Sequence, residues 1–165
     1  ARTEEDSYLA IPVGNKGLVI EKVDGPNHIK VVEEFGYEMY LHCGAIRKVL
    51  LAYQSPSFIE EYVKKIIEHD HAFPRVDAGD LRDELKKIRQ SGYAITYGEY
   101  VNDAVGIGAP VFNSEGELAG SIGIIAPTIR LNSEELLKVQ LEYVQKFAAD
   151  LSRDIGYSPL FSSRA

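Results

Sequence analysis

The residues of this sequence best suited to chemistry are a histidine beside the single cysteine and two histidines that flank an aspartate. His42 and Cys43 could supply a base and a nucleophile. We expect residues 38–43 to be extended, however, and neighbouring side chains of a strand point to opposite faces, so these two cannot pair. Cys43 is therefore interpreted as a small buried hydrophobe, and His42 as the anchor of a turn or part of a pocket mouth.

The histidines at positions 69 and 71 could bind a metal ion. A zinc site needs a third and a fourth ligand, and the sequence has no Cys-x-x-Cys or His-Glu-x-x-His pattern that would supply them. Gly106 and Gly108 do not form a dinucleotide fingerprint, because the third glycine is missing and the segment continues as a strand. We therefore expect no catalytic residue, no metal and no cofactor, and conclude that the chain is not an enzyme.

A predicted hairpin with several glycines inside its strands is the most unusual feature of the chain. One strand covers residues 105–112, a turn covers 113–116, and the second strand covers 118–127. Glycine weakens a strand, so it is tolerated there only where a ligand, a close backbone or a bend occupies the space of the missing side chain. We interpret these glycines as a hollow in the sheet, where a small molecule binds.

The rest of the chain supplies the elements that must position this hairpin. Turn signals and β-branched runs predict further strands over 7–13, 18–23, 29–32 and 94–97. Apolar spacing predicts helices over 45–53, 56–68, 78–91 and 133–155, with Asp77 and Asn132 as N-caps and Gly92 as a C-cap. The last helix has one apolar stripe, made by Leu137, Leu141, Val144, Ala148, Leu151 and Ile155. This order of elements predicts an α+β domain, an antiparallel sheet with helices packed on its faces.

Composition and charge narrow the possible functions. The 165 residues suffice for one domain, and the net charge of −7 with no lysine and arginine stripe argues against direct nucleic-acid binding. No apolar run approaches the roughly 20 residues of a membrane span, and a single cysteine fits a reducing cytoplasm. The start at Ala1, without methionine, suggests a piece of a longer chain. We expect residues 1–6 to end a linker, 7–156 to form the domain and 157–165 to form a tail.

Three blocks of sequence, in order, point to a known family. Residues 41–52 read Leu-His-Cys-Gly-Ala-Ile-Arg-Lys-Val-Leu-Leu-Ala, and residues 85–94 read Leu-x-x-Ile-Arg-x-x-Gly-Tyr-Ala, followed by Glu99. The third block is the hairpin, from Gly-Ala-Pro-Val-Phe at 108–112 through Gly120 to Ala-Pro at 126–127. Together they resemble the C-terminal effector-binding domain of the IclR family of bacterial transcription factors, over nearly the whole chain.

The resemblance implies a GAF-like fold with about six antiparallel strands and a pocket for a small metabolite. It also implies a homodimer or homotetramer, and a winged helix-turn-helix that precedes this domain and contacts DNA. This chain lacks that helix-turn-helix. Its expected role is therefore that of a cytoplasmic ligand sensor, which controls operator binding by the missing N-terminal domain.

The resemblance also implies which residues bind the effector. In family members that sense small acids, backbone amides at a helix N-terminus bind the ligand carboxylate, and Ala45 and Ile46 match those positions. The sequence alone equally allows these two to be the first turn of a packed helix. The positions where the small-acid sensors have polar, ligand-binding side chains correspond to Thr96, Gly106, Gly123 and Ile125. Their apolar pocket walls correspond to Val31 and Met39.

This chain differs from the small-acid sensors at each polar position. The acid, the thiol and two serines are replaced by Thr96, Gly106, Gly123 and Ile125. Losing hydrogen-bond partners in a buried site penalises polar ligands, so we expect a bulkier, more apolar acid, such as an aromatic one. Gly106 could alternatively mark a β-bulge with no ligand beside it.

Two questions stay open at this point. Arg47 replaces a glycine of the family pattern, and its side chain could point outward, reach an acidic ligand or reach a partner subunit. The second question concerns function, because a GAF-type signalling or oligomerisation module without a specific ligand would have a similar sequence. A small acyl- or amide-processing enzyme is the weakest alternative, because no nucleophile has a base at a suitable spacing.

Overall fold

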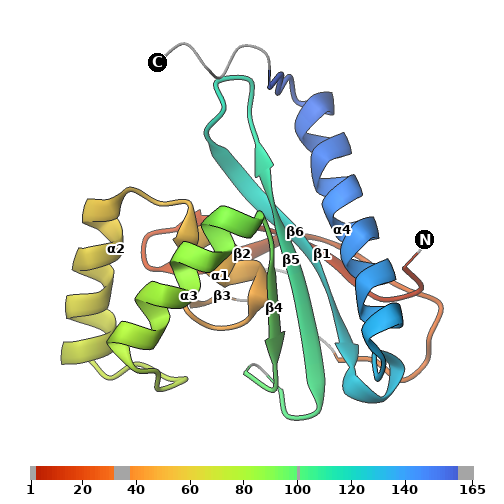
Figure 1. The fold of residues 1–165 in the computed structure, drawn as a ribbon, viewed down its shortest axis with the longest axis horizontal. Helices are drawn as coiled ribbons and strands as arrows, with labels where there is room; N and C mark the ends of the chain where they lie inside the picture. The colour runs from red at the N-terminus through yellow and green to blue at the C-terminus, as the bar shows by residue number, and fades with distance from the viewer. Residues whose placement is uncertain (1–2, 32–37, 100, 160–165) are drawn as a thin grey trace.

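An antiparallel sheet with helices on both faces forms the domain, as the computed structural model shows for residues 3–31, 38–99 and 101–159 (Figure 1). Within these residues the sheet has six strands in the order β3-β2-β1-β6-β5-β4. The strands are β1 (Ser7–Val13), β2 (Lys16–Val23), β3 (Glu38–Tyr40), β4 (Ala94–Tyr97), β5 (Ala104–Phe112) and β6 (Leu118–Pro127). The helices are α1 (Ala45–Ala52), α2 (Pro56–Tyr62), α3 (Ala78–Ser91) and α4 (Glu134–Asp154), with a π-helical turn η1 (Val63–His69) and a 3-10 turn η2 (Thr128–Arg130). The predicted α+β class is confirmed.

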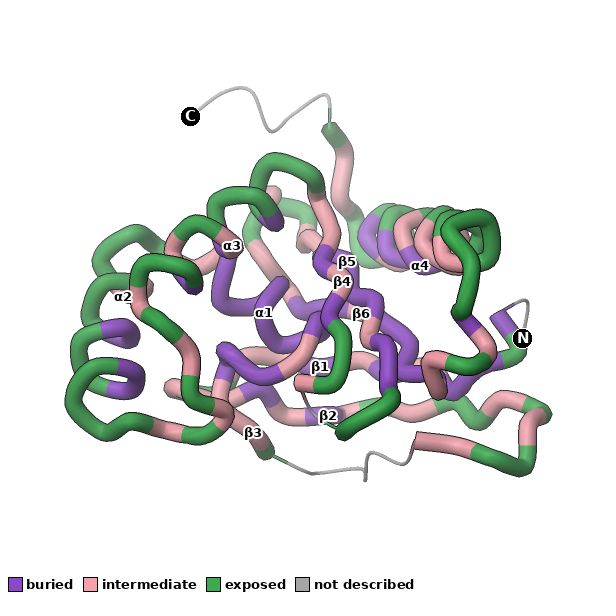
Figure 2. The backbone as a smooth tube through the Cα atoms, turned by 60° about the horizontal axis from the view of Figure 1, so that its bottom comes forward, coloured by how far each residue is buried: buried purple, intermediate pink, exposed green. Residues whose placement is uncertain are grey.

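The two faces of the hairpin β5–β6 support different layers. Figures 1 and 2 show α4 on one side of the sheet and α1, α2 and α3 on the other. Successive strand residues point to opposite faces. The buried residues that face α4 are Val105, Ile107, Ala109, Val111, Ile124 and Ala126, which pack with Val144 and Ala148. The glycines at 106, 108 and 123 therefore lie on the opposite face, toward α1.

Local signals explain where the helices begin and end. The Ser55 hydroxyl accepts a hydrogen bond from Phe58 N–H, and the Asp77 carboxylate accepts two from the first turn of α3. Gly92 ends α3 in the left-handed region with φ 78°, as predicted. The N-cap of α4 is Ser133, one residue after the predicted Asn132, because the Ser133 hydroxyl accepts from Leu136 N–H.

Four predicted elements differ from the structure. The helix predicted over 56–68 is α-helical only to Tyr62 and continues as the π-helical turn η1. Residues 29–31 form no strand, and position 32, the last of that predicted strand, lies outside the described residues. The extended segment predicted over 38–43 ends at Tyr40, because residues 41–44 turn the chain into α1. The apolar stripe of α4 packs on the sheet except at Ile155, which follows the last helical residue and is 45% exposed.

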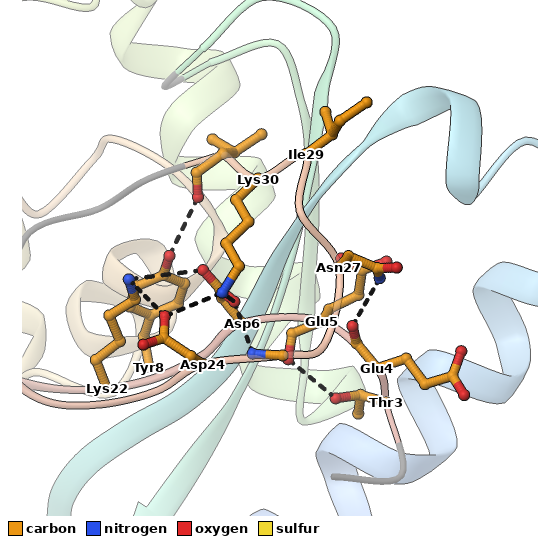
Figure 3. Close-up of polar contacts among 12 residues, drawn as sticks. Thr3, Glu4, Glu5, Asp6, Tyr8, Lys22, Asp24, Asn27, Ile29 and Lys30 are labelled. Carbon is orange, nitrogen blue, oxygen red and sulfur yellow. Dashed lines mark hydrogen bonds and ion pairs between the residues drawn. The ribbon is translucent and has the colours of Figure 1, made fainter.

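The segment before β1 is held against the domain by ion pairs between two buried carboxylates and three part-exposed cationic side chains. We call Glu5, Asp6, Lys22, Lys30 and Arg130 the N-terminal clamp. The Arg130 guanidinium donates to both Glu5 oxygens, at 2.6 and 2.5 Å, and the Lys30 amine lies 2.9 Å from Asp6. Figure 3 shows Lys22 and Lys30 extending toward Asp6. Glu5 and Asp6, which we expected at the end of a linker, are thus buried in the domain.

The last nine positions, expected to be a tail, are described only up to Pro159, and positions 1 and 2 also lie outside the described residues. Tyr157 packs its ring against Phe112, at a centroid distance of 5.4 Å. Among the described residues, no helix is long and apolar enough to cross a membrane.

Candidate functional site

The N-terminus of α1 lies over the hairpin, and its first amides are the candidate anion-binding groups. The turn over 41–44 brings the helix back across the sheet and places Gly44 at the N-cap, with φ 79°. That backbone conformation favours glycine because it has no Cβ. All eight residues of α1 are buried, so its first turn faces neighbouring strands rather than solvent.

Two side chains accept hydrogen bonds from these amides. Gly44 N–H donates to Glu99 Oε2 at 3.1 Å, and Ala45 N–H donates to Thr96 Oγ1 at 3.0 Å. The next amide, Ile46 N–H, is buried and has no hydrogen-bond acceptor within residues 3–31, 38–99 and 101–159. A carboxylate is favourable at a helix N-terminus because the helix dipole is positive there. The candidate anion site thus already holds a carboxylate of the chain itself.

Lys48 ties this carboxylate to a second one. Its side chain is 2% exposed, and its amine lies 2.5 Å from Glu99 Oε1 and 2.7 Å from Glu84 Oε2. Burying an ammonium group is costly unless it is paired. The two glutamates therefore explain how Lys48 is tolerated inside the domain, and they connect α1 with α3 and with the segment after β4.

A small cavity borders the first turn of α1. The volume within which the centre of a water molecule can move is about 20 Å³, so the cavity has room for about one water molecule. Known ligand pockets span about 300–1,000 Å³. A metabolite therefore requires the walls to move. The residues that line the cavity are Gly44, Ala45, Ile46, Arg47, Thr96, Gly98, Glu99, Ala104, Gly106 and Ile125.

Five of the residues predicted from the sequence meet at this cavity, from α1, β4, β5 and β6. They are Ala45, Ile46, Thr96, Gly106 and Ile125. Val31, Met39 and Gly123 are not among its lining residues. Val31 packs against the main core, where its carbonyl accepts from the Tyr8 hydroxyl, and Met39 Sδ lies 3.9 Å from the Cys43 thiol.

Gly108 and Gly123 accommodate α1 and do not form a hollow, which corrects the interpretation made from the sequence for these two positions. A Cβ built on Gly108 would lie 2.9 Å from Ile46 Cα. On Gly123 it would lie 2.5 Å from Ile46 Cγ1 and even closer to the Ile107 carbonyl oxygen. Real Cβ atoms do not approach other atoms so closely, so a close backbone, one of the three explanations considered, accounts for both positions. Gly106 has more room, with Thr96 Oγ1 at 3.2 Å.

Arg47 points into the domain, so the outward orientation considered for it is excluded. It is 3% exposed, and its Nε donates to the Gly17 carbonyl at 3.2 Å. A Cβ on Gly17 would lie 2.7 Å from Arg47 Cγ. Gly17 in β2 thus makes room for Arg47 in α1, the position at which the family pattern has a glycine.

His42 anchors the chain just before α1, one of the two roles expected for it. Its Nε2 lies 2.9 Å from the Pro74 carbonyl, which can only accept, so Nε2 carries the proton. Its Nδ1 then accepts from the Tyr62 hydroxyl at 2.7 Å, and that oxygen also accepts from His42 N–H. Burial lowers the pKa of His42, which favours the neutral ring, and burial raises the pKa of Tyr62.

The other candidate constellations stay apart. His69 pairs with Asp70 at 2.8 Å, and within the part of the chain that the structure describes no group of three His, Cys, Asp or Glu side chains could hold a metal ion. Sequence reasoning missed Glu84 and Gly98 and did not assign Glu99 to the site. The position of Glu99 after the Gly-Tyr block was the one available signal.

The cavity thus lies at the N-terminus of a helix, where the helix dipole favours a negatively charged group. The family model described as bacterial transcriptional regulator IclR C-terminal matches residues 1–153. The chain therefore belongs to the IclR family. This family consists of transcriptional regulators, in agreement with the expectation that the chain is not an enzyme.

Individual relatives agree with this assignment. The chain is 29% identical over 161 residues to the HTH-type transcriptional regulator KipR of Bacillus subtilis (strain 168), covering 94% of this chain and 62% of KipR. It is 27% identical over 158 residues to the HTH-type transcriptional regulator XynR of Escherichia coli (strain K12), with 94% and 62% covered. The crystal structure of the Thermotoga maritima IclR has a TM-score of 0.84 at 27% identity and covers 94% of this chain and 63% of its own. The chain thus spans less than two thirds of the length of these relatives.

Proposed function

We propose that this chain is the effector-binding domain of a cytoplasmic DNA-binding regulator and that its effector is an organic acid bound at the N-terminus of α1. The observation that carries the proposal is the cavity that borders this helix end. Its walls include Ile46, whose buried amide has no acceptor among the described residues. A carboxylate oxygen is a suitable partner for such an amide, because the helix dipole favours negative charge.

The walls of the cavity support a bulky, apolar acid. Ala45, Ala104, Gly106 and Ile125 offer no side-chain hydrogen bond, while Thr96 offers one hydroxyl. The charged side chains of Arg47 and Glu99 also line the cavity, and both already make hydrogen bonds within the domain. The Thr96 hydroxyl already accepts from Ala45 N–H, which leaves it one proton to donate and one further lone pair. A ligand rich in hydroxyl groups would lose its hydration there without compensation. An aromatic ring with one carboxylate would not.

The response to the effector follows from linkage. A ligand that binds two arrangements of the domain unequally shifts their populations, and the shift is passed to whatever the domain is joined to. We propose that this is a winged helix-turn-helix in a homodimer or homotetramer, since the relatives carry HTH-type names and extend beyond the matched region.

Thermal unfolding with a panel of acids tests the proposal. Benzoate and phenylacetate should raise the midpoint more than pyruvate or glyoxylate, and benzamide, which lacks the charge, should have no effect. Ile125→Ala should abolish the selectivity for aromatic acids. Ile122→Ala on the same strand, facing the α4 side, is the matched control and should keep it. If none of the acids stabilises the wild-type chain at millimolar concentration, the proposed function is wrong.

A signalling or oligomerisation module without a specific ligand is the second candidate. It is favoured by the small volume of the cavity and by apolar side chains exposed on α4, where Leu136 is 45% and Val139 is 41% exposed. Light scattering on Leu136→Glu separates the two candidates. Loss of assembly together with an absence of acid binding by the wild type would favour this alternative.

A further inference from the structure

We infer that Glu99 is a built-in competitor for the acid group of the effector and thereby determines which ligands the site admits. This inference rests on the proposed function, because it concerns the same cavity. Glu99 supplies the one carboxylate among the lining residues, and its Oε2 accepts from the N-cap amide of α1. An acid that binds the first turn of the helix must therefore share the helix end with Glu99 or replace it.

The position of Glu99 suits a group that can leave. Its side chain is 26% exposed, whereas Ala45, Ile46, Ala104 and Ile125, which line the same cavity, are each less than 9% exposed. Glu99 follows Gly98, which has φ 64° and open space where a Cβ would be. The wall that contains Glu99 is thus the one between the cavity and solvent. Its outward rotation enlarges the cavity without disturbing the packed helix.

The ion pairs around Lys48 make this exchange balanced in charge. When Glu99 leaves, Lys48 keeps Glu84 at 2.7 Å, so the buried ammonium is not left unpaired. The Gly44 amide loses its acceptor and needs another. An incoming carboxylate restores both the hydrogen bond and the charge beside Lys48. A neutral ligand restores neither fully, so Glu99 selects against neutral molecules of the same shape.

Thr96 completes the site from the other side. Its hydroxyl holds the Ala45 amide, and its own proton can be donated to an oxygen in the cavity. Ile46, whose amide has no acceptor among the described residues, also lines the cavity, so the site offers further donors besides the amide released by Glu99. The incoming group is therefore an oxygen-rich anion and not an amine.

Two variants test the inference, each of which removes the charge of one carboxylate paired with Lys48. Glu99→Gln keeps the shape but is a weaker acceptor, so this 165-residue chain should bind benzoate and phenylacetate on the order of tenfold more tightly than wild type, by calorimetry. Glu84→Gln is the matched control, because Glu84 pairs with Lys48 without touching the amides of α1. It should bind these acids no more tightly than wild type, because Lys48 then holds Glu99 alone.

Amide NMR shifts provide a second measurement. On adding benzoate to Glu99→Gln, the amide signals of Gly44, Ala45 and Ile46 should move, and benzamide should leave them unchanged. If wild type binds the acids and Glu99→Gln binds them equally or less tightly, the inference is wrong and the proposed function stands. If neither wild type nor Glu99→Gln binds any acid, both are wrong.

Discussion

Gly123→Ala should destabilise the domain far more than Gly106→Ala, although both glycines lie on the face of the hairpin that α1 covers. The added Cβ at Gly123 would lie 2.5 Å from Ile46 Cγ1 and closer still to the Ile107 carbonyl oxygen. At Gly106 the nearest atoms are Thr96 Oγ1 at 3.2 Å and Ala45 Cβ at 3.4 Å. The collision at Gly123 involves the main-chain carbonyl oxygen of Ile107 in β5, which, unlike a side chain, cannot rotate away.

The expected magnitudes follow from these distances. Overpacking a core costs about 1–3 kcal/mol, and the backbone collision places Gly123→Ala at about 3 kcal/mol or more. For a chain of this size that lowers the unfolding midpoint by roughly 6–12 °C. At Gly106 the crowding is offset by the reduced entropy of the unfolded chain, about 0.4–1 kcal/mol, so the net change stays within about 1 kcal/mol.

Urea and thermal unfolding of the two variants, followed by circular dichroism, measure the difference. Gly106→Ala also narrows the cavity at α1, so it should weaken acid binding without a loss of stability, which separates the site from the scaffold. A midpoint for Gly123→Ala within about 2 °C of wild type would show that space exists on this face after all. The explanation of the glycines by close packing would then be refuted.

Two further predictions concern buried polar groups. Burial lowers the pKa of His42, so below pH 6.5 the unfolded chain binds a proton there that the folded chain does not. The free energy of unfolding should therefore fall as the pH drops below that value. His42→Gln should reduce this pH dependence between pH 5 and 7 in urea titrations, and an unchanged slope would contradict the neutral, buried state of His42. Arg130→Gln should lower the free energy of unfolding by about 2–3 kcal/mol, because it leaves the buried Glu5 carboxylate without its partner. Arg82→Gln, which breaks a similar two-oxygen pair with the exposed Glu60, should have a much smaller effect, and equal losses would show that burial does not matter at Glu5.

Features set by neighbouring residues could be predicted from the sequence. The cap of α3 at Asp77 and its end at Gly92 depend on hydrogen bonds and backbone angles within a few residues. The hairpin was predicted for the same reason, since its turn and strands are contiguous. The strand predicted over 29–32 is wrong at its described positions, because the short apolar run lies in the exposed connection after β2, where Ile29 is 77% exposed.

The meaning of the glycines and the contents of the site could not be predicted in the same way. Whether a ligand or a helix fills the space above Gly123 depends on where α1 lies, and α1 is far away in the sequence. Lys48 pairs with Glu84, which is 36 positions away in the sequence, and with Glu99, which is 51 positions away. The family resemblance brought five cavity residues together. It included Glu99 after its second block but did not assign it to the site, because that role depends on a hydrogen bond from the backbone of Gly44.

The N-terminal clamp has a geometric consequence for signalling. Arg130 follows β6 by three residues, and Ile125 in β6 lines the cavity, while the carboxylate that Arg130 binds belongs to Glu5, just before β1. The chain at Glu5 is therefore tied to the segment that directly follows β6, so a movement of β6 is passed to the residues just before β1. A small rotation of β6 produces a displacement that grows with distance from the strand, so a group far from the cavity moves further than the cavity wall itself.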